Sequence, residues 1–206
     1  MNKKQKQIVL FLIFVIFIGN IVRYSHRSEK RAYADFRVYY ATAERFIQKE
    51  NIYARPDESI TPYKYSPMFA MIMAPLGFLS QKQASLVFFT INFVAIIAIL
   101  MLAKRFFQIQ DFDFKQTSIL YFLSILFTSR FILLVTDSGQ VGLLILLLVI
   151  GSLYLLWKDK PLSAALCLAV SIMIKYMPII FLPYFLIKKK YKFVAATVLF
   201  LILFSF

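Results

Sequence analysis

Asp35 is the acid in this sequence that is best placed to do chemistry. It lies near the start of the segment Ala34 to Gln48, where apolar residues recur at helical spacing with charged residues between them. We expect this amphipathic helix to lie in a membrane interface, which brings its first acid close to lipid head groups. A carboxylate there could take a proton from a hydroxyl group. The alternative is a solvated acid that stabilises a helix N-terminus.

Basic and polar side chains farther along the chain offer the complementary chemistry, the binding of an anion. The candidates are Lys64, Arg130, Asp137, Gln140 and Lys175. Structural alternatives exist, because Lys175 and Arg130 can snorkel toward the interface and Lys64 can bind head groups. Asp137 can simply cap the helix that follows it. Arg130 is harder to dismiss, since it lies about 9 Å below the end of its apolar run, where a charge is usually functional or paired.

Composition places the chain in a membrane. Hydrophobic residues make up 61% of the 206 positions, whereas soluble domains have about 45–50% apolar residues. The net charge of +14 comes from short basic clusters between apolar runs, which suit lipid head groups and topology rather than nucleic acid. The single cysteine, Cys167, excludes a disulfide framework and a thiolate metal site. We therefore expect an all-α, polytopic protein of the plasma membrane that needs no metal and binds no nucleic acid.

The apolar runs predict one integral membrane domain over residues 1–206. A first span at 8–22 precedes an outer loop with interfacial helices at 23–83, and a helical bundle follows at 84–206. Longer runs that can span a bilayer lie at 84–103, 118–136 and 141–157.

Basic linkers between these runs predict the topology. They lie at 104–115, 158–160 and 188–192, and the excess of lysine and arginine on cytoplasmic loops places all three inside. That arrangement requires Tyr65 to Leu79 to stay on the outer side. It also requires Leu162 to Ile187 to cross twice, with a break around Lys175 to Pro178 that the proline favours. The outer face then collects Asp35, Lys64, Asp137, Gln140 and Lys175.

Several short motifs also follow one another in a recognisable order. They are Asp35 with Tyr39-Tyr40, Asn51-Ile52-Tyr53, Tyr63-Lys64-Tyr65-Ser66-Pro67, Ala74-Pro75-Leu76, Gly139-Gln140-Val141, Ile174-Lys175-Tyr176-Met177-Pro178 and Leu182-Pro183-Tyr184. In this order the chain resembles glycosyltransferase family 87 of the GT-C superfamily, from about residue 30 to 192. The resemblance implies a polytopic enzyme that takes a sugar from a polyprenyl-phosphate carrier on the outer face. It further implies that Asp35 is the catalytic base and that Lys175 contacts the carrier phosphate.

The reaction implied by this resemblance is transfer of a hexose or pentose, mannose-like in the first instance, to a lipid or glycan acceptor. The base deprotonates the acceptor hydroxyl, while cations stabilise the departing phosphate. The candidates for substrate binding are Lys64, Tyr65, Arg130, Asp137, Gln140 and Lys175. The expected partners are membrane lipids, the polyprenyl-phosphate sugar donor and the acceptor, with no further cofactor.

Two other classes remain open from the residues alone. A transporter or flippase of lipid-linked sugars would use the same cations without needing Asp35 as a base. A structural membrane subunit would tolerate loss of all these charges. Because family members are commonly longer and the apolar run at 193–206 ends abruptly, we also expect an N-terminal fragment of a longer enzyme.

Overall fold

A computed structural model describes residues 34–54, 62–106 and 114–205, and the regular secondary structure within these ranges is helical, with no strand. The all-α prediction is therefore confirmed. The predicted first span at 8–22 lies outside the described residues, as do positions 23–33 and 55–61 of the predicted outer loop.

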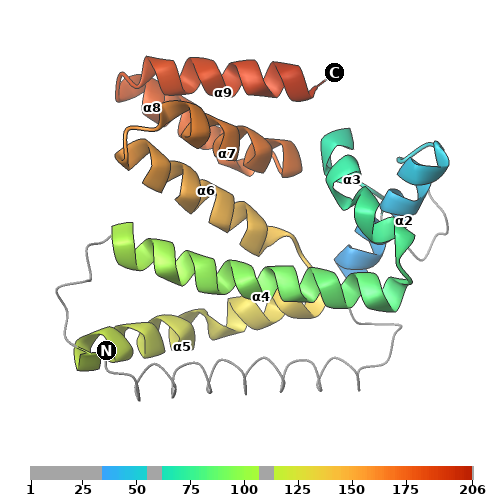
Figure 1. Cartoon of the computed structure of the whole chain (residues 1–206), viewed down its shortest axis with the longest axis horizontal. Helices are drawn as coiled ribbons and strands as arrows, with labels where there is room; N and C mark the ends of the chain where they lie inside the picture. The colour runs from blue at the N-terminus through green and yellow to red at the C-terminus, as the bar shows by residue number, and fades with distance from the viewer. Residues whose placement is uncertain (1–33, 55–61, 107–113, 206) are drawn as a thin grey trace.

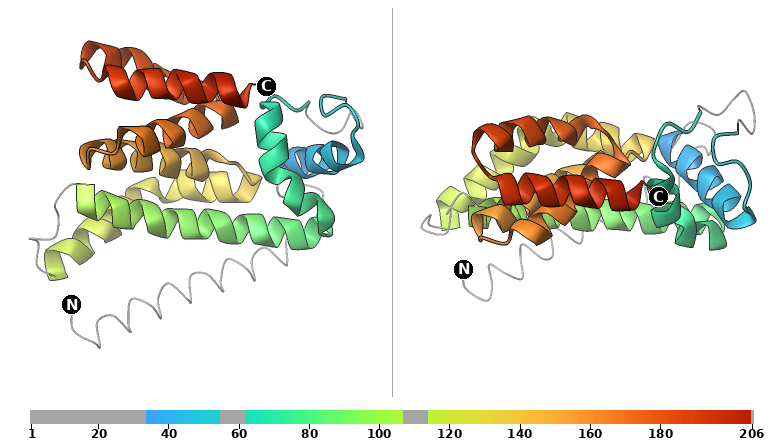
Figure 2. Two further views of the ribbon diagram at one scale, coloured as in Figure 1. Left: turned by 45° about the horizontal axis from the view of Figure 1, so that its top comes forward. Right: turned by 90° about the horizontal axis from the view of Figure 1, so that it is seen from above.

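The first described helix is α2, Ala34–Gln48, with the bounds that its amphipathic pattern predicts. Phe36, Tyr39 and Ala43 are almost fully buried on one face. The opposite face carries partly exposed charged residues such as Arg45. The buried face packs against α3 (Pro67–Met73) and the 3₁₀ helix η1 (Ala74–Phe78). Figures 1 and 2 show this group of short helices beside the first half of α4, Gln81–Phe106.

Local sequence explains how α3 begins and how η1 approaches α2. The Ser66 hydroxyl accepts a hydrogen bond from the backbone N–H of Phe69 at 3.3 Å, and Pro67 occupies the first turn, where its missing N–H costs nothing. Gly77 faces α2 so closely that a Cβ there would lie 2.7 Å from the Ile47 Cδ1 atom and 3.2 Å from the Ala43 backbone. Only glycine permits this approach without a shift of the neighbouring atoms.

The remaining helices are α5 (Phe114–Ser138), α6 (Gly142–Trp157), α7 (Pro161–Ile174), η3 (Met177–Ile180), α8 (Phe181–Ile187) and α9 (Tyr191–Phe204). They form layers on the two sides of α4, with α5 on one side and α6, α7 and α9 following one another on the other (Figure 1). α6 lies between α4 and α7, and α7 lies between α6 and α9 (Figure 1). Small residues let α6 and α7 approach closely, because the buried Ser152 hydroxyl donates to the Ala164 carbonyl at 2.8 Å.

The bundle has two distinct ends. At one end α2, α3 and the turn after α7 meet. At the other end the Phe106 ring at the close of α4 lies 6.3 Å from the Trp157 ring, and residues from 156–161 and 189–193 line one pocket. All three basic linkers therefore begin or lie at this second end. α7 runs from the basic end to the first, and the predicted break follows it between Ile174 and Met177 before η3 and α8 return.

Length separates α4 from the other apolar helices. α4 is long and apolar enough to span a membrane, and α5, which is bent by 46°, is a second candidate if its two halves count as one span. α6, with 16 residues, and α7 and α9, with 14 each, reach only about 21–24 Å at 1.5 Å per residue, against a hydrocarbon core of ~30 Å. The full set of predicted crossings is therefore not established by helix length.

Large apolar side chains nevertheless cover the outer surface of the bundle. Phe122, Phe127 and Phe131 on α5 are each about two-thirds exposed or more. Ile187 on α8 and Leu203 on α9 are also more than half exposed. So many exposed large apolar side chains indicate contact with lipid or another apolar partner.

Candidate functional site

A pocket of about 300 Å³ lies at the end of the bundle where α2, the loop before α3 and the turn after α7 meet. It is lined by Asp35, Val38 and Tyr39 from α2, by Pro62, Lys64, Tyr65 and Ser66 from the loop, and by Ile174, Lys175 and Tyr176 from the turn. Four of the predicted site residues, Asp35, Lys64, Tyr65 and Lys175, thus come together from segments far apart in the chain. The pocket holds one carboxylate and two ammonium groups.

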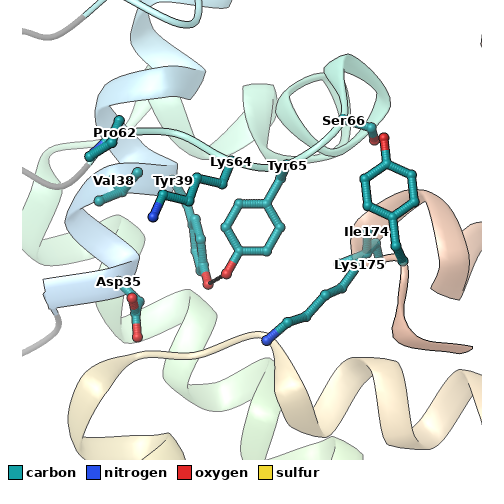
Figure 3. A pocket seen from close by; sticks show the side chains of 10 residues that line it. Asp35, Val38, Tyr39, Pro62, Lys64, Tyr65, Ser66, Ile174 and Lys175 are labelled. Carbon is teal, nitrogen blue, oxygen red and sulfur yellow. Dashed lines mark hydrogen bonds between the residues drawn. The ribbon is translucent and has the colours of Figure 1, made fainter.

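Figure 3 shows how these groups face one another. The Asp35 carboxylate and the Lys175 ammonium extend from opposite sides into the space below the Tyr39 and Tyr65 hydroxyls, while Lys64 lies above Asp35 in this view. Asp35 and Lys175 are partly to largely exposed to solvent. A small polar or anionic group in this space could therefore reach the carboxylate and an ammonium group together.

Tyrosine side chains hold the loop that carries Lys64. The Tyr39 and Tyr65 hydroxyls share a hydrogen bond of 2.8 Å. The Tyr63 hydroxyl donates to the Ser66 carbonyl at 2.8 Å, and the Tyr53 hydroxyl donates to the Tyr65 carbonyl at 3.3 Å. These bonds fix the extended backbone around Lys64, whose own side chain is exposed. The aromatic rings therefore position the lysine without enclosing it.

Tyr39 lies on α2 and contacts two further segments at this site, the Lys64 loop and the turn before α6. It is 1% exposed, and its ring contacts both Tyr65 and Phe69 edge to face at centroid distances of 5.1 Å. Burial, followed by the Tyr65 hydrogen bond and the negative charge of Asp35, raises the pKa of Tyr39 far above its ordinary value. A backbone hydrogen bond from Val141 acts weakly in the opposite direction. Tyr39 therefore stays a neutral hydroxyl between α2, the Lys64 loop and the turn before α6.

Lys175 owes its position to the end of α7. Its backbone is extended, with φ −151° and ψ 131°, and its N–H still donates to the Ser171 carbonyl at 3.1 Å. Ile174, just before it, is buried in the same hydrophobic cluster as Tyr39 and Phe69. The helix end is thus anchored while the lysine side chain remains free to extend into the pocket.

Three of the predicted residues, Arg130, Asp137 and Gln140, do not line the pocket. Arg130 is exposed on α5, eight positions before the end of that helix at Ser138. Asp137 and Gln140 are half-buried at the turn between α5 and α6. This turn reaches the site through Val141, which is 2% exposed and packs in the cluster that contains Tyr39. Gln140 is therefore adjacent to the site rather than part of its wall.

Tyr39 also lines the pocket, although sequence reasoning assigned it no role. A usable signal was present, since Tyr39 follows Asp35 by four residues and so lies on the same side of α2. Its partner Tyr65, 26 residues later, could be identified only in three dimensions.

The described part of the chain has helices and no strand, many exposed apolar side chains, and a pocket that holds a carboxylate and lysines. These features are typical of a membrane protein with a polar site at one end of a helical bundle. The model of glycosyltransferase family 87 matches residues 63–206, more than half of the chain, and the chain belongs to this family. It is therefore a membrane glycosyltransferase. The matched range includes Lys64 and Lys175, whereas Asp35 precedes it. No curated protein and no solved structure matches the chain.

Proposed function

We propose that this protein transfers a sugar from a polyprenyl-phosphate carrier to a hydroxyl of a lipid or glycan acceptor, at the pocket between α2 and the end of α7. The observation that carries the proposal is the convergence of Asp35, Lys64 and Lys175 on one pocket of about 300 Å³. A hexose such as mannose, or a pentose, is the sugar that we propose, by the family resemblance.

Asp35 is the proposed general base. It takes the proton from the acceptor hydroxyl as that oxygen attacks the anomeric carbon, and the bond from that carbon to the carrier phosphate breaks. The neutral Tyr39 hydroxyl near Asp35 is bonded to the Tyr65 hydroxyl, which fixes the wall of the pocket beside the carboxylate. We assign it a positioning role.

Lys175 and Lys64 are the proposed partners of the departing phosphate. Both line the pocket, and the Lys175 ammonium extends toward Asp35 (Figure 3). Ammonium groups that face the phosphate stabilise the charge that develops as the carrier leaves. Lysine charge thus performs the neutralisation, and the proposal requires no metal ion, so a chelator should leave the rate unchanged. Tyr65 is proposed to contact the substrate at the same wall of the pocket. Gln140, Asp137 and Arg130 lie outside the pocket and are proposed to contact parts of the donor that extend beyond it.

The proposed orientation puts the pocket end outside and the basic end in the cytoplasm. The three basic linkers at one end support it, because such linkers remain on the cytoplasmic side. α4, α5, α6, α7, the η3–α8 pair and α9 then cross in alternating directions, with α2 in the outer interface. Single cysteines at Ser80 and Lys188, in a Cys167→Ser background, should react with impermeant reagents from opposite sides. Reaction of both from one side would contradict the orientation.

The alternative function is movement of lipid-linked sugars across the bilayer. It uses the same lysines, yet it gives Asp35 no chemical task. Membranes that contain the protein should be incubated with polyprenyl phosphate carrying radiolabelled mannose, glucose or arabinose. Transfer predicts that the label leaves the carrier for a new covalent partner, in an amount that depends on Asp35. A label that changes sides while remaining on its carrier would instead identify a flippase.

A further inference from the structure

The end of the bundle opposite the proposed active site carries a second pocket, of about 340 Å³. It lies between the turn that joins α6 to α7 and the turn that joins α8 to α9. The lining residues are Leu156, Asp159, Pro161, Lys189, Lys190, Tyr191, Lys192 and Phe193. Nothing in the transfer reaction uses this pocket.

We propose that this pocket binds the phosphate head group of an anionic phospholipid in the leaflet on the basic side of the membrane. Three lysines face one carboxylate, that of Asp159, so the wall has an excess of positive charge. Basic pockets between helices at a cytoplasmic membrane surface are suited to anionic head groups. The proposal concerns a site separate from sugar transfer and does not depend on the roles given to Asp35 or Lys175.

The lysines at this end fall into two groups, those that lie over aromatic rings and those that line the pocket. The Lys158 ammonium lies 4.3 Å from the centroid of the Trp157 ring, and the Lys188 ammonium lies 5.9 Å from that of Tyr184. Each of these two lysines is thus held over an aromatic face. Lys189, Lys190 and Lys192 are exposed at the pocket instead and are available to an anion.

The backbone at the pocket favours an anion as well. α7 and α9 both start here, and neither Lys160 nor Lys190, their N-cap residues, makes a side-chain capping bond. The first-turn N–H groups of α9 therefore add positive partial charge beside the lysines.

Apolar side chains in the same wall select a lipid over a free phosphate. Leu156 and the exposed Tyr191 line the pocket together with the lysines. From there the outer surface continues along α8 and α9 through exposed residues such as Ile187 and Leu203. A lipid whose head group lies in the pocket would therefore have exposed apolar side chains on α8 and α9 for its acyl chains to contact.

Trp157, the single tryptophan of the sequence, provides a local probe. It lies next to Leu156 of the pocket wall and is 45% exposed. The full chain should be reconstituted in phosphatidylcholine vesicles that contain increasing fractions of a lipid with brominated acyl chains, which quench nearby tryptophan. Brominated phosphatidylglycerol should reach half-maximal quenching at a several-fold lower mole fraction than brominated phosphatidylcholine. Equal mole fractions for the two lipids would overturn the proposal.

Charge variants test which lysines create this preference. Lys190→Gln with Lys192→Gln should weaken it on the order of fivefold per lysine, whereas Asp159→Asn should strengthen it. The matched control, Lys49→Gln with Lys82→Gln, removes two exposed charges elsewhere and should retain the preference. An equal loss in both double variants would show nonspecific attraction and would refute the pocket.

Two further measurements serve as controls, one for folding and one for competition by a soluble phosphate. An unchanged helix content and Trp157 emission wavelength in pure phosphatidylcholine show that each variant has folded and inserted. Millimolar glycerol phosphate should not compete with the lipid, and competition by it would show that the pocket recognises a soluble phosphate. Sugar transfer measured in the same vesicles separates this proposal from the previous one, because either can fail while the other holds.

Discussion

The Tyr39 and Tyr65 hydroxyls meet at 2.8 Å and join the helix that carries Asp35 to the loop that carries Lys64. Each tyrosine lines the pocket close to its charged neighbour. The segments that carry the acid and this lysine are thus joined by a bond between two neutral side chains, which keeps its strength over the physiological pH range.

The first prediction tests this bond by a double-mutant cycle. Tyr39→Phe and Tyr65→Phe each remove one hydroxyl and retain the ring contacts. Thermal unfolding in detergent should show a coupling free energy of about 1 kcal/mol between the two changes, as expected for one hydrogen bond. Tyr176→Phe, at an exposed position of the same pocket, should not couple to Tyr39→Phe. Strict additivity of the first pair would show that the bond adds nothing to stability.

The second prediction concerns Asp35 as a base. Asp35→Asn retains the size of the side chain and should lower the rate of sugar transfer by about 10²–10⁴, the usual contribution of a general base. Glu50→Gln, an exposed change just after α2, is the control and should leave the rate unaltered. The parental rate in the Asn variant, at equal membrane abundance, would leave Asp35 as a solvated acid.

The third prediction separates charge from geometry at Lys175. Lys175→Gln should weaken binding of the polyprenyl-phosphate donor, and Lys175→Arg should recover part of the loss because the charge persists while its shape differs. Titration of the donor into purified protein measures both effects, with Lys82→Gln as a control of equal charge change. Unchanged donor affinity in the Gln variant would mean that Lys175 only anchors the end of α7 at the interface.

The fourth prediction uses two glycines with opposite surroundings. Gly77→Ala forces a Cβ against the backbone of α2 and should destabilise the protein by about 1–3 kcal/mol, as overpacking does. It should also lower transfer, because α2 carries Asp35. Gly151→Ala, in α6 with nothing within 4 Å of the new Cβ, should be neutral or stabilising by up to about 1 kcal/mol. Unfolding temperatures compare the two, and a milder effect at Gly77 than at Gly151 would contradict the packing.

The fifth prediction follows from the raised pKa of Tyr39. Unfolded tyrosine loses its proton near pH 10.0, while folded Tyr39 retains it. The folded state therefore holds more protons above pH 10, so its stability is complete below that pH and falls above it, by up to about 1.4 kcal/mol per pH unit. Near-ultraviolet circular dichroism between pH 8 and 12 should show this loss. The loss should be shallower in Tyr39→Phe and unchanged in Tyr154→Phe, and equal slopes in all three would exclude Tyr39 as its source.

Local pattern predicted where the main helices of this protein lie. The period of apolar residues fixed α2 at Ala34–Gln48, and Pro178 marked the break after α7, because helix periodicity and proline geometry act over a few residues. The order of short motifs indicated the family that the match over residues 63–206 then showed. The individual charges, by contrast, each had an ordinary structural explanation in the sequence.

Tertiary structure decided which of those charges share a site. Asp35, Lys64 and Lys175 line one pocket, while Arg130 remains exposed on α5. It also showed that Tyr39 joins α2 to the loop of Lys64 and that Gly77 brings η1 close to α2. Both contacts involve partners that are distant in the chain or belong to another helix. The physical reason is that spacing within a helix sets which face a residue occupies, whereas the neighbour on that face is chosen by packing between helices. Lys189, Lys190 and Lys192 were one basic run in the sequence, and only the fold of α6 to α9 gave them a pocket.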